Sequence, residues 1–208
     1  DYANYEVFFT LASAADRVHD VLRRLLAGSR HPAHIVIAGT PRSCGEKVNN
    51  LRAAVEEVPP EFEVLVFVDS DGRPPRAWLR QMVAPLADPQ LGATTTMRWY
   101  VPNRGGFWSA LAAAWNAPVA TYLGEHRRNF CWGGGTAIPR SVFDEVNALE
   151  HWRGSVSDDY ALTRALNAAG RPIEFLPECL VPTLHDADFD ALLEFTNRQM
   201  IITRVHAP

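Results

Sequence analysis

Five consecutive apolar residues, Val64 to Val68, limit the fold of this chain more than any other feature. A short run of β-branched and aromatic residues without polar alternation is typical of a strand that is buried on both faces. Such strands form α/β sheets, which open their ligand crevice at the carboxyl ends of the strands. The run is followed directly by Asp69 and Asp71. We therefore expect these two carboxylates at the rim of a crevice.

Asp69 and Asp71 are spaced so that they can hold one hard divalent cation and leave open positions for a phosphate. The alternative is a simple turn, in which Asp71 or Gly72 caps a helix that begins at Pro74. A calcium-binding EF-hand loop is excluded, because Pro74 and Arg80 occupy the positions that require Gly and Glu.

Strand-like and helix-like segments alternate along the rest of the chain, which predicts a mostly parallel sheet with helices on both faces. We expect a single domain over residues 1–208, with an upstream strand outside this sequence. The expected strands are Tyr5–Leu11, His34–Gly39, Val64–Val68, Ala93–Tyr100, one around Thr136, and Ile173–Leu176. The expected helices are Arg17–Ala27, Asn49–Val58, Pro74–Leu86, Phe107–Leu123, Ser141–Ala148, Ser157–Ala169 and Asp188–Arg204.

Composition narrows the function classes. The 208 residues are 47% hydrophobic and 21% charged, which is ordinary for a globular domain. A net charge of -4 and the lack of a basic run argue against a nucleic-acid partner. The three cysteines are odd in number and widely spaced, which suggests reduced thiols in a cytosolic compartment.

Three further segments carry candidate chemistry. Asp158 and Asp159 open a helix, where carboxylates either oppose the helix dipole or, packed in a crevice, raise one another's pKa and suit a general base. The segment Glu46 to Asn50 is either a turn with a helix cap, or a cation and amides that meet a diphosphate or a base. Gly133 to Gly135 is either a plain strand entry or a place where backbone approaches a ligand closely.

Trp108, Trp115 and Tyr122 recur every seven residues and so share one face of a helix. Such a stripe is typical of core packing. The alternative is an apolar ledge that receives a lipid acceptor or touches a membrane.

The order of these motifs resembles ceramide glucosyltransferase-type inverting glycosyltransferases of the GT-A fold (family 2/21-like). The resemblance covers residues 4–205. It rests on Lys47-Val48-Asn49-Asn50-Leu51, Val68-Asp69-Ser70-Asp71, Cys131-Trp132-Gly133, Ala137-Ile138-Pro139-Arg140 and Ser157-Asp158-Asp159-Tyr160.

The resemblance implies transfer of a sugar from a nucleotide-sugar donor such as UDP-glucose to a lipid-like hydroxyl acceptor. It implies Mg or Mn held by Asp69 and Asp71, with Asp159, or failing that Asp158, as the base. It further implies membrane anchoring at the cytoplasmic face by transmembrane helices outside this sequence. The residues implied for donor binding are Lys47, Asn50 and Asp69, and those implied for acceptor binding are Trp132, Gly133 and Gly134.

The chain departs from the family pattern at both ends. Ser13 stands where the family usually has an aspartate near the nucleobase. Near the carboxyl end Arg198 is kept, but Ile201 and Ile202 replace an Arg-Trp pair. We expect Arg198 or Arg204 to supply the missing contact to the donor diphosphate.

Two other functions fit part of the pattern. Val66 to Gly72 also resembles the first motif of haloacid dehalogenase-like phosphatases, in which the first aspartate is a nucleophile. However, Arg73 replaces the usual Thr or Ser. The third interpretation is a degenerate nucleotide-sugar binder without activity, which Ser13 and Ile201-Ile202 would favour.

Overall fold

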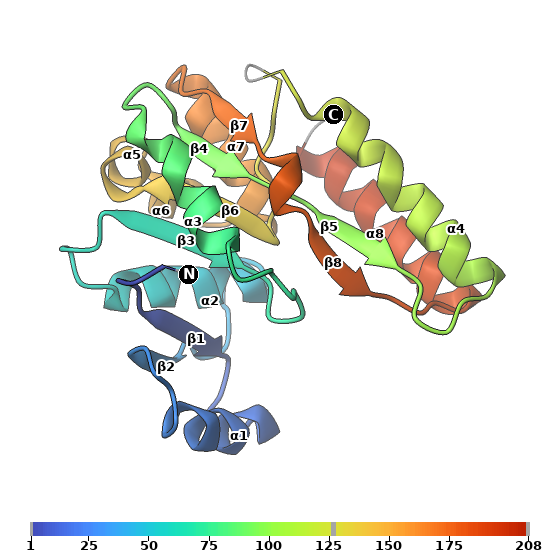
Figure 1. The fold of residues 1–208 in the computed structure, drawn as a ribbon, viewed down its shortest axis with the longest axis horizontal. Coiled ribbons are helices and arrows are strands. Elements are labelled where there is room, and N and C mark those ends of the chain that lie inside the picture. The colour runs from blue at the N-terminus through green and yellow to red at the C-terminus, as the bar shows by residue number, and fades with distance from the viewer. Residues whose placement is uncertain (1, 126–127, 207–208) are drawn as a thin grey trace.

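The computed structural model describes residues 2–125 and 128–206, and strands and helices alternate along them as predicted (Figure 1). The strands are β1 (Val7–Leu11), β2 (Ala33–Ile37), β3 (Val64–Val68), β4 (Ala93–Thr95), β5 (Arg98–Val101), β6 (Gly135–Pro139), β7 (Ile173–Phe175) and β8 (Val181–Leu184). The α-helices are α1 (Arg17–Leu26), α2 (Glu46–Glu57), α3 (Trp78–Val83), α4 (Phe107–Asn116), α5 (Arg140–Glu145), α6 (Ala148–Trp152), α7 (Asp158–Ala168) and α8 (Phe189–His206). Short 3-10 helices are η1 (Ala84–Ala87), η2 (Ala117–Tyr122) and η3 (Pro177–Cys179).

The central sheet has the strand order β3-β6-β4-β7. β4 and β7 pair in parallel, whereas β6 runs antiparallel to both β3 and β4. β3, β4 and β7 therefore point the same way, and their carboxyl ends lie at one edge. β1 pairs with β2, and β5 with β8, also in parallel. The predicted mostly parallel α/β sheet is confirmed, with β6 as the exception.

Helices cover both faces of the central sheet. This arrangement explains why every residue of β3 is apolar. Leu65 and Phe67 join the larger core, which includes residues of α2, α5, α6 and α7. Val64 and Val66 pack instead against the smaller cluster around Trp78 and Met82 of α3. Because neighbouring side chains of a strand face opposite ways, both faces of β3 need apolar residues.

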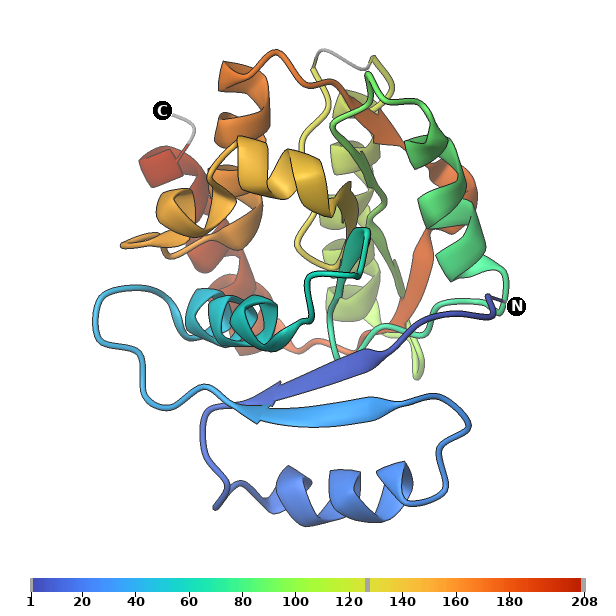
Figure 2. The same ribbon diagram turned by 90° about the vertical axis from the view of Figure 1, so that its left-hand side faces the viewer.

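Two units extend from the central sheet. β1, β2 and α1 lie together beside it (Figures 1 and 2). β5, β8, α4 and α8 form an arm that extends to the right of the central sheet in Figure 1, whereas β1, β2 and α1 lie below it. The side chain of Asn49 in α2 donates to the carbonyls of Ala38 and Gly39, each at 3.1 Å, just beyond the end of β2. This contact brings the start of α2 to the end of β2.

The structure corrects several local expectations. The helix expected over Ser141–Ala148 is divided into α5 and α6, and the helix expected from Asn49 begins already at Glu46. α3 begins at Trp78 and not at Pro74, because the Asp69 carbonyl accepts from the Gly72 amide at 3.1 Å and closes a turn first. Asp71 and Gly72 therefore do not cap a helix at the prolines. The strand expected over Ala93–Tyr100 is divided into β4 and β5. β8 was not predicted.

The aromatic stripe is exposed and not core. Trp108 is 37% exposed, Trp115 51% and Tyr122 73%. The α-helical part ends at Asn116, and the last turns are 3-10. Within the described residues, no helix combines the length and the hydrophobicity needed to cross a bilayer.

Candidate active site

The first turns of α2 and α7 meet next to the carboxyl end of β3. The Gly45 amide, at the cap of α2, donates to the Ser155 carbonyl at 2.9 Å. A Cβ on Gly45 would lie only 2.7 Å from the Val156 carbonyl oxygen, so the close approach requires glycine. The Ser157 side chain caps α7 by accepting from the Tyr160 amide. These contacts place Lys47 of α2 beside Asp158 of α7.

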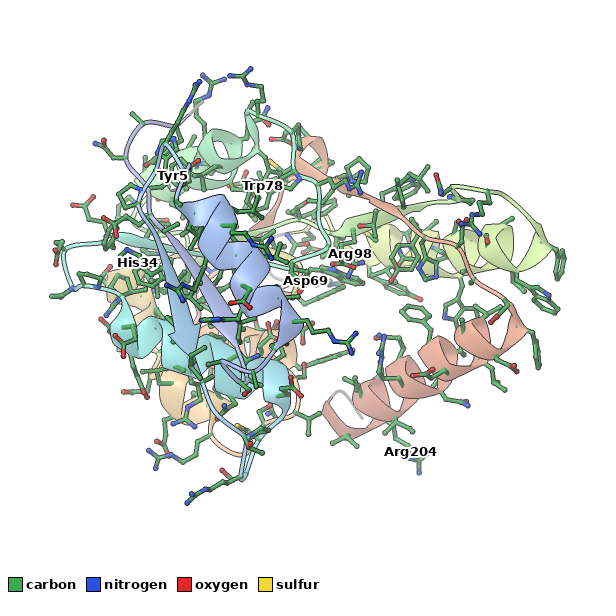
Figure 3. All side chains as sticks on the ribbon, turned by 90° about the horizontal axis from the view of Figure 1, so that it is seen from below. Tyr5, His34, Asp69, Trp78, Arg98 and Arg204 are labelled. Carbon is green, nitrogen blue, oxygen red and sulfur yellow. The ribbon has the colours of Figure 1, made fainter. Side chains whose placement is uncertain are left out.

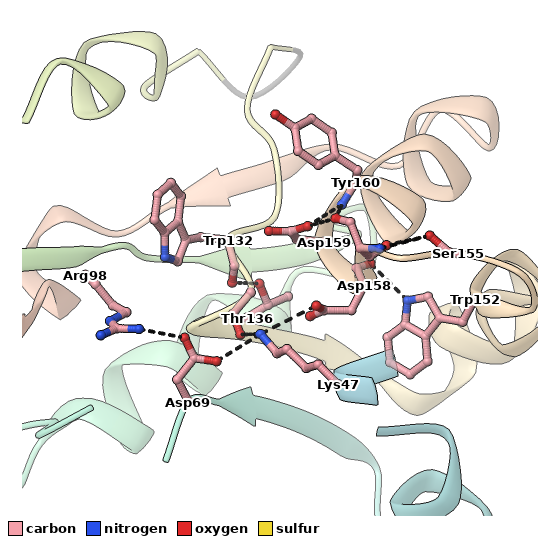
Figure 4. Close-up of polar contacts among 12 residues, drawn as sticks. Lys47, Asp69, Arg98, Trp132, Thr136, Trp152, Ser155, Asp158, Asp159 and Tyr160 are labelled. Atoms are coloured by element: carbon pink, nitrogen blue, oxygen red, sulfur yellow. Dashed lines mark hydrogen bonds and ion pairs between the residues drawn. The ribbon is translucent and has the colours of Figure 1, made fainter. Parts of the chain in front are cut away.

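Lys47 contacts motifs that are far apart in the sequence (Figure 4). Its Nζ lies 2.9 Å from Asp69 Oδ1 and 3.5 Å from Asp158 Oδ1. The same ammonium donates to the Gly133 carbonyl at 2.8 Å. One cation therefore contacts the acidic end of β3, the acidic start of α7 and the glycine loop before β6.

The electrostatics of this cluster are perturbed. Burial raises the pKa of the Asp158 carboxyl to about 6; the Lys47 ammonium opposes this rise and the Asp159 charge adds to it. Burial lowers the pKa of Lys47, but the charges of Asp158, Asp69 and Asp159 together raise it more, so Lys47 stays protonated. Shifted carboxylates in a crevice are typical of functional sites.

The hydrogen bonds that orient the Asp159 carboxylate end on one of its two oxygens. Its Oδ1 accepts from the Ser157 hydroxyl and, at 2.8 Å, from the Tyr160 amide. Its Oδ2 faces the space beside Gly133, where an added Cβ would lie 3.3 Å away. Asp159 is half-buried, whereas only 11% of the Asp158 side chain is exposed. An oriented carboxylate with one oxygen toward the crevice suits a proton acceptor.

The glycines of the loop allow carboxylates and backbone to come close. A Cβ on Gly133 would lie 2.7 Å from Lys47 Nζ, and a Cβ on Gly134 would lie 2.8 Å from Asp69 Oδ2. The backbone of Trp132 is held by side chains of the sheet, because its amide donates to Thr95 Oγ1 at 2.8 Å and its carbonyl accepts from Thr136 Oγ1 at 2.9 Å.

Arg98 is the one site residue that sequence reasoning missed. Its Nη1 lies 3.3 Å from Asp69 Oδ2, and its Nη2 contacts Asp71 Oδ2. The two carboxylates that the sequence predicted as a pair thus converge on one cationic group. The only sequence signal was an arginine inside an expected strand, and nothing there pointed toward the crevice.

The other predicted donor residues lie at different distances from this centre. Asn50 follows Lys47 by one turn of α2, and its Oδ1 is buried without a hydrogen-bond partner in the described structure. Ser13 is exposed after β1 and accepts from the Ala15 amide in its own loop. Arg198 is exposed and lies over the Phe195 ring. Figure 3 shows Arg204 on the side of α8 that faces away from Asp69.

The carboxylates of Asp69 and Asp71, which follow β3, have the chemistry to bind a divalent cation. Asp69 and Asp71 already share one positively charged group, the Arg98 guanidinium, so their oxygens can converge on one ion. Within residues 2–125 and 128–206, no three acidic, His or Cys side chains are arranged to hold a metal. A cation here would therefore complete its coordination with donor phosphates and water, as Mg²⁺ commonly does.

Comparison with solved structures identifies the fold. A 4-diphosphocytidyl-2C-methyl-D-erythritol synthase from Anaerococcus prevotii superposes with a TM-score of 0.52 at 7% identity, over 94% of this chain and 97% of that one. A mycobacterial protein gives a TM-score of 0.42 at 15% identity, over 90% and 69%. Mannosyl-3-phosphoglycerate synthase from Rubrobacter xylanophilus gives 0.39 at 12% identity, over 98% and 75%.

A comparison with curated proteins gave no significant match. The family model for glycosyl transferase family 21, however, matches residues 1–207, which is nearly the whole chain. The match agrees with the resemblance seen in the motif order. The chain has the GT-A fold of nucleotide-sugar transferases and belongs to glycosyl transferase family 21.

Proposed function

We propose that this glycosyltransferase moves a sugar, with inversion, from a nucleotide-sugar donor to the hydroxyl of a lipid-like acceptor. The observation that carries the proposal is the position of Lys47, which joins Asp69, Asp158 and the Gly133 carbonyl in one cluster. Cationic and carboxylate groups at the ends of parallel strands suit a diphosphate and the ion that accompanies it.

Each group of the cluster has a role in this proposal. Lys47 and Asn50 bind the donor, and Asp69 and Asp71 hold Mg or Mn. A bound cation would offset the negative charge that develops on the departing diphosphate. Asp159 takes the proton of the acceptor hydroxyl through its Oδ2, the oxygen that faces Gly133. Asp158 keeps Lys47 oriented toward the donor.

The exposed apolar side chains of the arm support the proposal that the acceptor is lipid-like. Large apolar side chains are exposed on both of its helices, which is uncommon on a surface that meets only water. They are Phe107, Trp108, Leu111 and Trp115 of α4 and Phe189, Leu193, Met200, Ile201 and Val205 of α8.

Two hydrogen bonds connect the helices of the arm to residues of the polar cluster or next to it. Asn116 at the end of α4 donates to the Arg98 carbonyl at 2.9 Å. The hydroxyl of Tyr160, the residue after Asp159, contacts Thr203 Oγ1 of α8 at 3.1 Å. A lipid could therefore lie along the arm while its hydroxyl reaches Asp159. The three cysteines are free thiols, which suits the cytoplasmic face of a membrane.

The test begins with a thermal-shift screen of nucleotide sugars in the presence of Mn²⁺, with UDP-glucose first. The donor that stabilises the protein is then incubated with a long-chain hydroxyl acceptor in micelles, and mass spectrometry measures the glycolipid. The proposal predicts a glycolipid product and no hydrolysis of a generic phosphate ester. Ester hydrolysis without transfer would favour the phosphatase, and donor binding without transfer would favour a non-catalytic binder.

A further inference from the structure

Arg98 is held at the boundary between the central sheet and the arm by three polar contacts. It is the first residue of β5, and only 17% of its side chain is exposed. Its Nη1 and Nη2 contact Asp69 and Asp71, and its Nε donates to Thr183 Oγ1 of β8 at 3.2 Å. The guanidinium therefore lies across both carboxylates that are expected to hold a cation.

The surroundings keep this side chain in place. Its guanidinium lies over the Tyr100 ring at 5.8 Å from the centroid. A Cβ on Gly134 would lie 3.0 Å from the Arg98 Cδ, so only glycine leaves room for the stem. The three polar contacts use one N–H on each nitrogen, and a guanidinium has five. Two further N–H groups of Arg98 are therefore available to a second anionic group.

Arg98 and a divalent cation need the same carboxylates. Arg98 contacts Oδ2 of Asp69 and Oδ2 of Asp71, and Lys47 contacts Oδ1 of Asp69, so a cation that binds both carboxylates meets the guanidinium. Two positive groups that contact the same carboxylates repel each other, so binding of one weakens binding of the other. The carboxylates therefore exchange one cation for the other.

An arginine released from two carboxylates is well suited to a diphosphate, because its planar fork matches phosphate oxygens. The terminal helix has no arginine at the position of the family's Arg-Trp pair, because apolar Ile201 and Ile202 stand there. Ile201 is 63% exposed. Arg204 points away from Asp69 in Figure 3. Arg98 is the arginine that is already next to the cluster (Figure 4).

We propose that Arg98 is a donor-phosphate ligand that changes partners: it neutralises Asp69 and Asp71 in the free protein and turns to the donor diphosphate when a divalent cation takes the carboxylates. This proposal rests on the proposed function of the same cluster. In the free protein Arg98 excludes the cation, so cation and nucleotide bind together. No covalent bond is formed or broken in the exchange; the hydrogen bonds of Arg98 to Asp69 and Asp71 are replaced by hydrogen bonds to the diphosphate.

Two calorimetric titrations of Arg98→Gln test the exchange. We expect the affinity to rise in one titration and to fall in the other. Mn²⁺ alone should bind the variant at least about tenfold more tightly than it binds the wild type, because a competing charge is gone. UDP with saturating Mn²⁺ should bind the variant about tenfold more weakly, because a charge-assisted contact to phosphate is lost. Unchanged affinity in either titration would overturn the proposal.

Arg171→Gln is the matched control. It also removes an arginine that pairs with a carboxylate, Glu145, but at the start of β7, where the strands have their amino ends. The affinities of Arg171→Gln for Mn²⁺ alone and for UDP with saturating Mn²⁺ should both equal those of the wild type. Arg98→Lys keeps the charge and loses the fork, so it should show both effects in smaller measure, and it still decides the matter if Arg98→Gln does not fold.

The outcome also separates this proposal from the proposed function. If the wild type binds UDP with Mn²⁺ and the Arg98 variants match it in both titrations, only the partner exchange is wrong. If the wild type binds no nucleoside diphosphate or nucleotide sugar with Mn²⁺, the proposed function fails and the exchange fails with it.

Discussion

Replacing Asp158 by Asn should stabilise the fold at alkaline pH. The pKa of this carboxyl is raised from 3.8 to about 6, mainly by burial. The folded protein therefore takes up a proton between about pH 4 and pH 6 that the unfolded chain does not hold. A shift of about two units corresponds to about 3 kcal/mol of unfolding free energy. The destabilisation caused by the buried charge is absent below the ordinary pKa of Asp158 and reaches its full value above pH 6.

Asn has the shape of Asp and does not ionise. The unfolding free energy of Asp158→Asn should therefore exceed that of the wild type by up to about 3 kcal/mol at pH 8, and should match it near pH 4. Urea denaturation at both pH values, in EDTA, measures the difference. The pKa of about 6 already includes the attraction of Lys47, which opposes the effect of burial.

Asp186→Asn provides a control of opposite sign. The amides of Arg104 and Asn103 donate to Asp186 and lower its pKa. Its stabilisation is thus present above the ordinary pKa of 3.8 and is lost only as the pH falls through the lowered pKa of the folded state, so Asp186→Asn should destabilise the fold at both pH 8 and pH 4. If Asp158→Asn is no more stable than the wild type at pH 8, or differs from it equally at both pH values, the assigned burial of this charge is wrong.

Three further outcomes follow from the same cluster. Asp159→Asn should lose about 10² to 10⁴ in transfer rate and keep its donor affinity, which parallel rate and binding measurements check. Gly133→Ala should weaken donor binding in calorimetry, because the added Cβ would lie 2.7 Å from Lys47 Nζ. Arg198→Ala or Arg204→Ala should weaken nucleotide-sugar binding if the terminal helix takes part in the site; equal affinity in both variants would show that it does not.

The acidic end of β3 was predictable because its cause is local. A strand buried on both faces needs a continuous apolar run, and the residues after it must turn at the carboxyl edge of the sheet. Asp69 and Asp71 follow from that argument. The start of α7 was predictable for a similar reason, because Ser157 has the chemistry of a helix cap and the acidic pair follows it.

The remaining parts depend on pairing between distant segments. Arg98 reaches Asp69 only because β5 leaves the central sheet after Thr95 and pairs with β8, more than 80 residues later. β8 has a proline at its second position, which argues against a strand in a sequence pattern. The direction of β6 is likewise a property of the assembled sheet. The aromatic stripe was misjudged because periodicity shows which residues share a face and not whether that face is covered.

A single calorimetric comparison tests the central claim, that this cluster is a cation-dependent nucleotide-sugar site. UDP-glucose, or the donor that the thermal screen identifies, is titrated into the wild type with Mn²⁺, into the wild type with EDTA, and into Asp69→Asn with Mn²⁺. We expect binding in the first titration and a loss of affinity of at least about tenfold in the other two. Equal affinity in all three would contradict it.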